Sequence, residues 1–122
     1  MLLKKAVSTL LLGALCASLT AQADVKIGVI TSSTGPIALV GIPQKNSIAL
    51  MPSEAGGEAI RYVALDDGSD PTATVKAFKK LLDEEKVDAI IGPSGSPNAM
   101  GVIQFAAESG TPCLLYTSDA AD

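Results

Sequence analysis

The sequence contains no histidine. Because histidine is the commonest metal ligand and the commonest general base near neutral pH, its absence disfavours most metal centres and many hydrolytic mechanisms. Cysteine is nearly absent too, since Cys113 is the only one outside the N-terminal segment that contains Cys16. Leu15, which precedes Cys16, is larger than the residue that a lipoprotein signal places there. We therefore expect neither an intramolecular disulfide nor a lipid-modified cysteine in the mature chain.

Basic residues are scarce, with nine Lys and Arg against 13 Asp and Glu. Two of the nine, Lys4 and Lys5, lie at the extreme N-terminus; without them seven basic residues face 13 acidic ones, a net charge of −6. Such a chain, which has no basic patch with interleaved aromatic residues, is a poor candidate for binding nucleic acid or an anionic membrane surface. The lysines at 76–80 lie among helix-forming residues and are interpreted as a solvated helix face.

The N-terminus has the pattern of a secretory signal peptide. Lys4 and Lys5 precede an uncharged stretch at 6–19, which at about 14 residues is short for a membrane span. Ala21 and Ala23 then supply the small-x-small motif of a cleavage site. We expect cleavage after Ala23 and a periplasmic mature protein, with an uncleaved N-terminal anchor as the alternative.

The rest of the chain alternates strand-like and helix-like segments. Strands are predicted at residues 25–30, 60–65 and 88–91, and a fourth begins after Gly110. Helices are predicted at residues 43–51, from Pro71 onward, and from Pro97 to Gly110. This order predicts an α/β fold in which helices cover both faces of a parallel sheet.

Two of the predicted helices carry a start signal in which a capping residue precedes proline. Asp70 precedes Pro71 and Ser96 precedes Pro97, so Asp70 and Ser96 are the predicted N-caps. Apolar residues at helical spacing predict which face of each helix is buried. They are Val75, Phe78 and Leu82 in the earlier helix, and Met100, Ile103 and Ala107, widened by Val102 and Ala106, in the later one.

Two hydroxyl-rich loops follow the first and third predicted strands. They are residues 31–36, Thr-Ser-Ser-Thr-Gly-Pro, and residues 92–97, Gly-Pro-Ser-Gly-Ser-Pro. In a parallel sheet, loops at the carboxyl ends of strands border the crevice where small ligands bind. Hydroxyl groups there suit a zwitterion or a small carboxylate, and a helix N-terminus favours an anion. With the export signal, the loops predict extracytoplasmic capture of a small polar molecule; plain turn formation is the alternative.

Asp66 and Asp67 are adjacent acids at a strand end, a common place for catalytic groups. Successive strand residues point to opposite faces, so the two are not expected to serve one reaction. The loop at 92–97 lacks both the Gly-Lys-Ser/Thr ending of a nucleotide-binding loop and the Gly-x-Ser-x-Gly motif of a hydrolase. We predict no catalytic residue, metal or cofactor, and keep a small α/β enzyme using Asp66 or Asp67 as the alternative.

The order and spacing of these motifs resemble type I periplasmic binding proteins of the Leu/Ile/Val-binding kind. The resemblance spans about residues 25–112 and is weakest at 51–55, a stretch that is shorter than in the family and contains Pro52. It implies an N-terminal fragment of a two-lobed protein that closes on its ligand and delivers it to an ABC importer. The motifs that carry it, in order, are Ile27-Gly28-Val29, Thr34-Gly35-Pro36, Gly41, Gly56-Gly57, Leu65-Asp66-Asp67, Ser69-Asp70-Pro71, residues 87–93, residues 94–97 and Ala106-Ala107-Glu108.

The resemblance also implies the residues that bind ligand. Ser96 matches the hydroxyl that receives the ligand carboxylate, and Ser94 lies close by. Ser33, Thr34 and Gly35 belong to the loop after the first strand, which lines the cleft. The implied ligand is a small carboxylate such as an aliphatic amino acid, although the broad family also binds amides and aromatic acids. The implied partners are ABC transporter permease subunits; a receptor lobe that senses ligand without transport is the alternative.

The resemblance divides the chain into a signal peptide at 1–23, a partial N-terminal lobe at 24–112 and a tail at 113–122. The tail resembles translated sequencing-adapter sequence, and we expect it to be foreign; a genuine divergent strand is the alternative. In the family, the loop after the fourth strand supplies a hydroxyl and a carbonyl for the ligand's amino group. That loop falls in the tail here, so Thr117 and Ser118 are not assigned this role.

Overall fold

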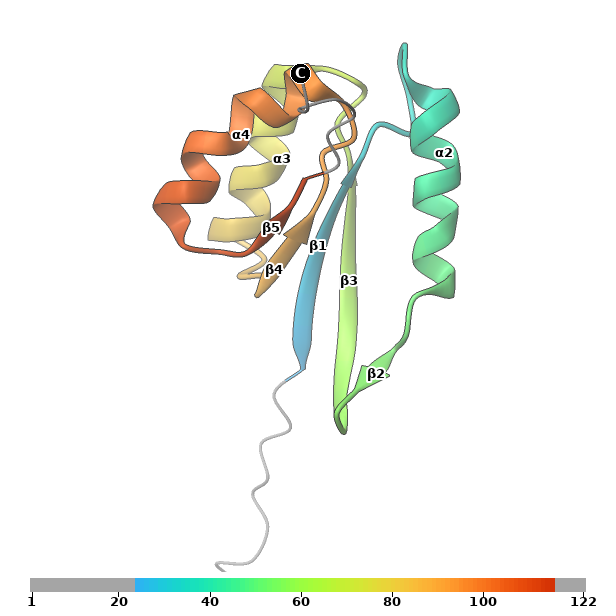
Figure 1. Ribbon diagram of the computed structural model, residues 1–122, viewed down its shortest axis with the longest axis vertical. Helices are drawn as coiled ribbons and strands as arrows, with labels where there is room; N and C mark the ends of the chain where they lie inside the picture. Colours follow the sequence, from blue (N-terminus) through green and yellow to red (C-terminus); the bar gives the residue numbers. More distant parts are fainter. Residues whose placement is uncertain (1–23, 116–122) are drawn as a thin grey trace, which may run out of the picture.

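The computed structural model describes residues 24–115, which form a five-stranded sheet with helices on both faces (Figure 1). This architecture confirms the predicted fold class. The predicted signal peptide and residues 116–122 of the tail lie outside the described residues. The strands are β1 (Val25–Thr31), β2 (Glu54–Ala55), β3 (Glu58–Asp66), β4 (Ala89–Ile91) and β5 (Cys113–Leu114). The helices are α2 (Ala38–Ser47), the short 3-10 helix η1 (Ile48–Leu50), α3 (Pro71–Asp83) and α4 (Ser96–Ser109).

The sheet has the strand order β2-β3-β1-β4-β5, with β1 at its centre. Strand β1 pairs in parallel with β3, from Val25 opposite Ile60 to Thr31 opposite Asp66, and in parallel with β4 on its other side. Strand β5 continues the parallel sheet, whereas β2 pairs antiparallel with β3. Because β1, β3 and β4 run in the same direction, the loops that follow them meet at one edge of the sheet.

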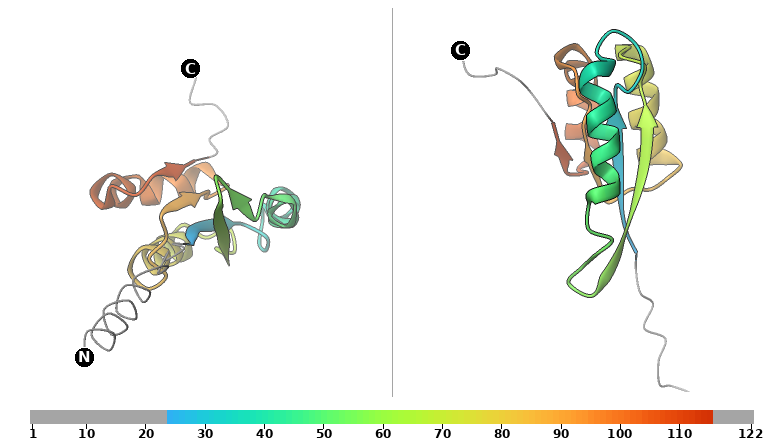
Figure 2. Two further views of the ribbon diagram at one scale, coloured as in Figure 1. Left: turned by 90° about the horizontal axis from the view of Figure 1, so that it is seen from below. Right: turned by 90° about the vertical axis from the view of Figure 1, so that its right-hand side faces the viewer.

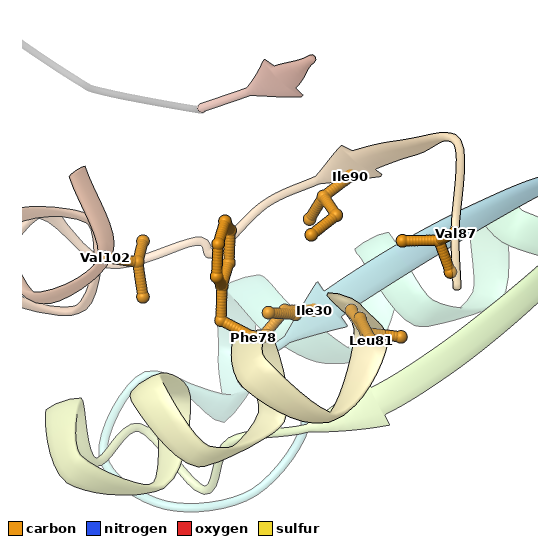
Figure 3. Packing of buried hydrophobic residues seen from close by; sticks show 6 residues of the cluster. All are labelled: Ile30, Phe78, Leu81, Val87, Ile90 and Val102. Carbon is orange, nitrogen blue, oxygen red and sulfur yellow. The ribbon is translucent and has the colours of Figure 1, made fainter. Parts of the chain in front are cut away.

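Helices α3 and α4 cover one face of the sheet, and α2 lies on the other (Figures 1 and 2). The hydrophobic core lies between the sheet and the α3–α4 layer (Figure 3). Gly28 of β1 makes room for this layer, because a Cβ there would lie 2.7 Å from Leu81 Cδ1. The buried core residues are Ile30, Phe78, Leu81, Val87, Ile90 and Val102.

The helix after β1 begins earlier than predicted. It starts at Ala38, so Pro43 lies inside α2 rather than in its first turn. The early start follows from the loop, because Gly41 is buried against it: a Cβ on Gly41 would lie 2.0 Å from the carbonyl oxygen of Ser32. The ring of Pro43 leaves the carbonyl of Leu39 without its helical partner, and Leu39 is 90% exposed, where water can serve that carbonyl. The helical stretch ends with η1, before Pro52, as predicted.

The buried face of α3 is close to the prediction, whereas that of α4 agrees with it only at Val102 and Ala106. Phe78 is fully buried, but Thr74 and Leu81 take the buried positions, while Val75 and Leu82 pack at the edge of the core. In α4 the predicted Met100, Ile103 and Ala107 are exposed. The buried residues are Asn98, Ala99 and Val102, with Phe105 and Ala106 packed against the core. The spacing of apolar residues does not predict this buried face, because the face begins with a polar residue, Asn98.

One end of the sheet adds a short strand to the prediction, and the other end holds the predicted fourth strand. Before the strand predicted at 60–65, β2 pairs with the start of β3 in a hairpin. The predicted fourth strand is present as β5, in which Cys113 pairs with Ile90 and Leu114 with Ile91. Thus β5 uses the first two residues of the segment predicted to be foreign, whose origin stays a prediction. Among the described residues, no helix is both long enough and apolar enough to cross a membrane.

Candidate ligand-binding site

A hollow of about 650 Å³ opens at the edge of the sheet where β1, β3 and β4 end. Three segments that are distant in sequence form its walls, and none of the lining residues is charged. Its polar groups are therefore hydroxyls, one amide side chain and backbone. The lining residues are Pro36, Ile37 and Val40 after β1, Ser69 and Pro71 after β3, and the run from Ser94 to Asn98 after β4.

The five predicted ligand-binding residues divide into two groups in the structure. Ser94 and Ser96 line the hollow, on either side of Gly95. Ser33, Thr34 and Gly35 do not line it, but directly precede the segment that does. The predicted crevice is thus bordered by both hydroxyl-rich loops, with the serines after β4 nearest its interior.

The loop after β1 is held in place by Asp66, the last residue of β3. Its Oδ1 accepts hydrogen bonds from the backbone N–H groups of Ser33 (3.0 Å), Thr34 (3.3 Å) and Gly68 (3.0 Å). Its Oδ2 accepts the hydroxyl of Thr34 at 2.7 Å. Gly35 lets the two loops touch, because its φ is +81° and a Cβ there would lie 2.2 Å from the carbonyl oxygen of Gly68. Ser33, Thr34 and Gly35 therefore fix this wall of the hollow.

The pKa of Asp66 lies below its ordinary value. Partial desolvation raises this pKa, but hydrogen bonds from Gly68, Thr34 and Ser33 lower it and together prevail. They do so because each donor stabilises the ionised carboxylate more than the neutral acid. The loop after β1 is therefore held best when Asp66 is ionised.

The opposite wall is the first turn of α4. Gly95 is the N-cap and Ser96 is the first helical residue, so no side chain caps this end of α4. The prediction that Ser96 caps this helix is thus wrong: the extended backbone of Gly95 (φ −95°, ψ 139°) places the cap one residue earlier. The exposed hydroxyl of Ser96 and the backbone N–H groups of Ser96 and Asn98 are left open to a ligand, whereas Pro97 has no N–H and that of Ala99 donates to the Gly95 carbonyl.

Ser94 connects this wall to the helix on the other face of the sheet. Its hydroxyl donates a hydrogen bond to Oε1 of Gln44 in α2. The oxygen of Ser94 keeps acceptor capacity, since a hydroxyl carries two lone pairs. Ser94 therefore offers a ligand an acceptor more readily than a donor, whereas Ser96 can offer either.

Asp66 and Asp67 face different partners, as expected for successive residues at a strand end. Asp67 is 1% exposed and accepts four hydrogen bonds inside the lobe. Both carboxylates are thus engaged in holding loops and helices together, which gives the alternative of an enzyme that uses them no geometric support. Within residues 24–115, no group of three or more His, Cys, Asp or Glu is placed to hold a metal ion.

A second, smaller hollow of about 230 Å³ lies between α2 and the sheet. Its lining is mostly aliphatic, with Val29, Met51, Ile91 and Leu115 among the residues. It shares Ser94 with the larger hollow but lacks Ser96 and the N-terminus of α4. The larger hollow is therefore the candidate site, since it alone combines hydroxyls with the N–H groups of a helix end.

Asn98, Ile37 and Val40 line the candidate site and were not predicted from the sequence. Asn98 gave one signal, which is a polar side chain two residues after the Ser-Pro helix start. Ile37 and Val40 gave none, because the predicted helix began at Pro43 and left both in a loop. They follow only from the early start of α2 at Ala38.

Comparison with known proteins identifies the family. The family model for periplasmic binding proteins matches residues 24–122. The chain is 31% identical over 124 aligned positions to the Leu/Ile/Val-binding protein BraC3 of Rhizobium johnstonii, covering 97% of this chain and 34% of that protein. The chain therefore spans about a third of the length of this curated relative.

Solved structures agree with this result. An extracellular ligand-binding receptor from Rhodopseudomonas palustris HaA2 superposes with a TM-score of 0.79 at 46% identity, over 81% of this chain and 27% of the receptor. The leucine-binding protein LivK of Thermotoga maritima superposes with a TM-score of 0.71 at 32% identity, over 75% of this chain and 26% of LivK. A solute-binding protein of an ABC transporter from Rhodopseudomonas palustris BisB5, solved with 3,4-dihydroxybenzoic acid, gives 0.71 at 26% identity, over 75% of this chain and 26% of that protein. The chain belongs to the periplasmic binding protein family.

Proposed function

We propose that this chain forms part of the first lobe of a solute-binding protein that captures a small carboxylate for an ABC importer. The observation that carries the proposal is the uncharged hollow in which the Ser96 hydroxyl meets the N-terminus of α4. A helix N-terminus and nearby hydroxyls can bind an anion without a cationic side chain. A neutral binding site of this kind accepts a carboxylate that carries its own compensating amino group.

The apolar residues across the hollow from Ser96 favour one kind of carboxylate ligand. Ile37 and Val40 line the same hollow as Ser96. They would give an aliphatic side chain an apolar surface while Ser96 holds the carboxylate. Burial of such a chain is favourable by about 25 cal/mol per Å² of apolar area removed from water. We therefore favour an aliphatic amino acid as the ligand, in keeping with the Leu/Ile/Val-binding relative.

In this proposal the five predicted site residues act in two ways. Ser96, and secondarily Ser94, contact the ligand. Ser33, Thr34 and Gly35 form the rim after β1, where their hydrogen bonds and close contacts to the loop after β3 keep Ile37 in place. The amino group of the ligand and its far side would be bound by parts of the protein outside the described residues.

An aromatic acid is the second candidate ligand. The observation that favours it is the solved ABC-transporter binding protein that holds 3,4-dihydroxybenzoic acid. The carboxylate would use the same end of α4, and the ring would lie against Ile37 and Val40. The two candidates differ in whether the site needs an amino group on the ligand.

The proposed setting is the periplasm, reached by cleavage of the signal after Ala23. Permease subunits of an ABC transporter are the proposed partners. The family's extracytoplasmic binding proteins and the ABC-transporter protein among the solved relatives support this assignment. Sensing without transport would use the same site and is distinguished by the partner, not by the ligand.

The proposal is tested by calorimetric titration of the complete binding protein with L-leucine, L-valine, 3,4-dihydroxybenzoate and L-leucinamide. We expect at least one of the three carboxylates to bind, and L-leucinamide, which lacks the carboxylate, to bind at least tenfold more weakly than L-leucine. Equal or tighter binding of L-leucinamide would show that no carboxylate is recognised. Tight binding of the benzoate with no binding of either amino acid would select the aromatic acid.

A further inference from the structure

Asp67 joins four segments of the lobe through one buried carboxylate. Its Oδ1 accepts hydrogen bonds from the hydroxyl of Ser32 (2.7 Å) and the backbone N–H of Ser69 (2.9 Å). Its Oδ2 accepts from the hydroxyl of Thr74 and from Nδ2 of Asn98, both at 2.8 Å. These donors belong to the loop after β1, the loop after β3, α3 and α4. Oδ1 thus binds the two loops, and Oδ2 binds the two helices.

The helix-facing side is a closed network of three side chains. Nδ2 of Asn98 lies 2.8 Å from Asp67 and 2.6 Å from Oγ1 of Thr74, and its two hydrogens can serve both acceptors. Thr74 has a single hydroxyl hydrogen although two acceptors, Asp67 and the Asp70 carbonyl, lie 2.8 Å away. The charged carboxylate is the stronger acceptor. Thr74 and Asn98 are both buried, and no buried side-chain polar atom in the described residues lacks a partner.

Asn98 carries this network into the candidate site. It lies in the first turn of α4, two residues after Ser96, and lines the hollow itself. Its Oδ1 sits against the backbone of Gly95, where a Cβ would approach it to 3.0 Å. The amide of Asn98 is therefore held between Asp67 on one side and the loop that carries Ser94 and Ser96 on the other.

We propose that Asp67 and Asn98 are positioning residues, which fix the first turn of α4 so that Ser96 and the adjacent N–H groups face the ligand carboxylate. Neither side chain is proposed to contact the ligand carboxylate. A binding group must be held within a fraction of an ångström by its supporting residues, and Asp67 provides that support from beneath the site. The benefit to ligand binding rests on the proposed function. Whether Asp67 and Asn98 order the first turn of α4 can be measured without any ligand.

The hydrogen bond from Asn98 to Asp67 can be reversed by exchanging the two side chains. In Asp67→Asn, the amide oxygen can keep the Oδ1 contacts to Ser32 and Ser69, while the new NH₂ faces the NH₂ of Asn98. In Asn98→Asp, two carboxylates face each other. The double variant Asp67→Asn/Asn98→Asp restores a donor opposite an acceptor, and Thr74 can again donate to a carboxylate. A positioning role therefore predicts damage in each single variant and recovery in the double one.

The first measurement is amide hydrogen exchange of this chain. We expect Asp67→Asn and Asn98→Asp to accelerate exchange at Ala99, whose N–H donates to the Gly95 carbonyl at 2.8 Å, by about tenfold or more, because each variant loses a hydrogen bond that involves a charged group. Exchange at Val29 in the centre of β1 should change far less. The double variant should return exchange at Ala99 to within about threefold of the wild type, the margin expected for an imperfect swap.

The control is Asp70→Ala, which removes the side-chain cap to the Ala73 N–H, a hydrogen bond that lies within α3 and its N-cap. It should lower stability while leaving exchange at Ala99 close to the wild type. If Asp67→Asn does not fold, Asn98→Ala removes only the α4 link and gives the same comparison. Uniform acceleration across β1 and α4, or no recovery in the double variant, would overturn the positioning role.

A second measurement links the turn to the ligand. In the complete protein, Asn98→Ala should weaken L-leucine binding about tenfold at a temperature well below its unfolding transition. Faster exchange in α4 with unchanged L-leucine affinity would overturn the proposal. If the wild-type protein binds neither L-leucine nor any other small carboxylate, the proposed function fails, while the exchange comparison still decides whether Asp67 orders the turn.

Discussion

At the scale of single residues, Ser96 separates binding from stability. Its side chain makes no capping hydrogen bond, because Gly95 occupies the N-cap position. The hydroxyl is therefore not needed to hold α4. If one serine hydroxyl both capped a helix and bound the ligand, its removal would lower stability and affinity together. The two effects could then not be separated.

Ser96→Ala in the complete protein should weaken binding of the cognate carboxylate by roughly 10- to 150-fold, since a hydrogen bond to a charged group contributes about 1.5–3 kcal/mol. The melting temperature should stay at the wild-type value, because no capping bond is lost. Titration calorimetry and thermal unfolding measure the two effects. Ser109→Ala, at the far end of the same helix, is the matched control and should leave affinity unchanged. Unchanged affinity in Ser96→Ala would remove the hydroxyl from the site.

Asp66 predicts how the lobe responds to acid. Its folded-state pKa is lowered, so the ionised form is favoured by folding and its contribution is complete well above the ordinary aspartate pKa of about 4. That contribution is lost as the pH falls through the lowered pKa. Asp66→Asn should therefore unfold at lower urea than the wild type at pH 7, and the gap should shrink at pH 3. Glu54→Gln, which changes an exposed carboxyl of β2, is the control. A gap that is equal at both pH values would contradict the role assigned to the Asp66 carboxylate.

Ser94 and Ser96 lie in a loop that could be placed at the edge of the sheet from the sequence, because strand ends and helix starts can be recognised from local patterns, and both line the hollow. Their contact with a ligand stays a prediction. The sequence did not reveal Asn98 or Asp67 as partners, which are 31 residues apart in the chain. Hydrogen bonds between side chains on different elements depend on how α3 and α4 pack, and no local pattern encodes that packing. The predicted cap at Ser96 failed for a local reason, since the extended backbone of Gly95 takes the cap position.

At the scale of elements, α2 and α4 each contain a glycine with a different purpose. Gly41 of α2 touches the loop after β1, where a Cβ would lie 2.0 Å from the backbone oxygen of Ser32. Gly101 of α4 has more space, since the nearest atom to its Cβ would be Cγ2 of Val75 at 3.6 Å. The contact at Gly41 explains why α2 starts at Ala38, a boundary that the position of Pro43 alone placed too late.

Gly41→Ala should destabilise the lobe by about 1–3 kcal/mol, as is typical of overpacked sites, because backbone atoms cannot yield as a side chain can. Gly101→Ala is the matched control in a helix interior. It should be neutral or stabilising by up to about 1 kcal/mol, the difference in helix propensity between the two residues. Urea unfolding of both variants gives the comparison. Equal stability of the two would show that α2 does not depend on its close approach to Ser32.

The element order was predictable because β-branched runs and Asp-Pro or Ser-Pro starts are local signals. The buried face of α4 was not, and Met100 at 75% exposure shows why. The apolar spacing of Met100, Ile103 and Ala107 is regular, but the core already receives Val102 and Phe105 from the other side of the helix. Periodicity predicts that a helix has an apolar face. Where a helix has two apolar faces, as α4 does, periodicity does not predict which one is buried.

At the scale of the whole molecule, the chain covers 34% of the length of a curated relative and 27% of a solved receptor. In the proposed function, the described residues provide one side of the ligand-binding cleft. A ligand bound to one side alone stays partly hydrated, so full affinity requires the complete protein.

Export provides a prediction for the intact gene product. Cleavage after Ala23 should give a mature protein that starts at Asp24, because Ala21 and Ala23 satisfy the small-residue requirement of the processing site. Intact-mass analysis of the exported protein measures this directly. Ala23→Leu should block processing, whereas Gln22→Leu, between the two small positions, should be processed normally. A mature protein that begins at Cys16 with attached lipid would contradict the predicted site.

The central claim is that the first turn of α4 holds the carboxylate of the ligand. A crystal structure of the complete protein bound to whichever carboxylate it retains tests this most directly. We predict a carboxylate oxygen about 2.5–3.0 Å from Oγ of Ser96, in the hollow lined by Ile37 and Val40, with the side chain of Asn98 still bonded to Asp67. A carboxylate bound in the hollow between α2 and the sheet, or held by a cation away from α4, would contradict the claim.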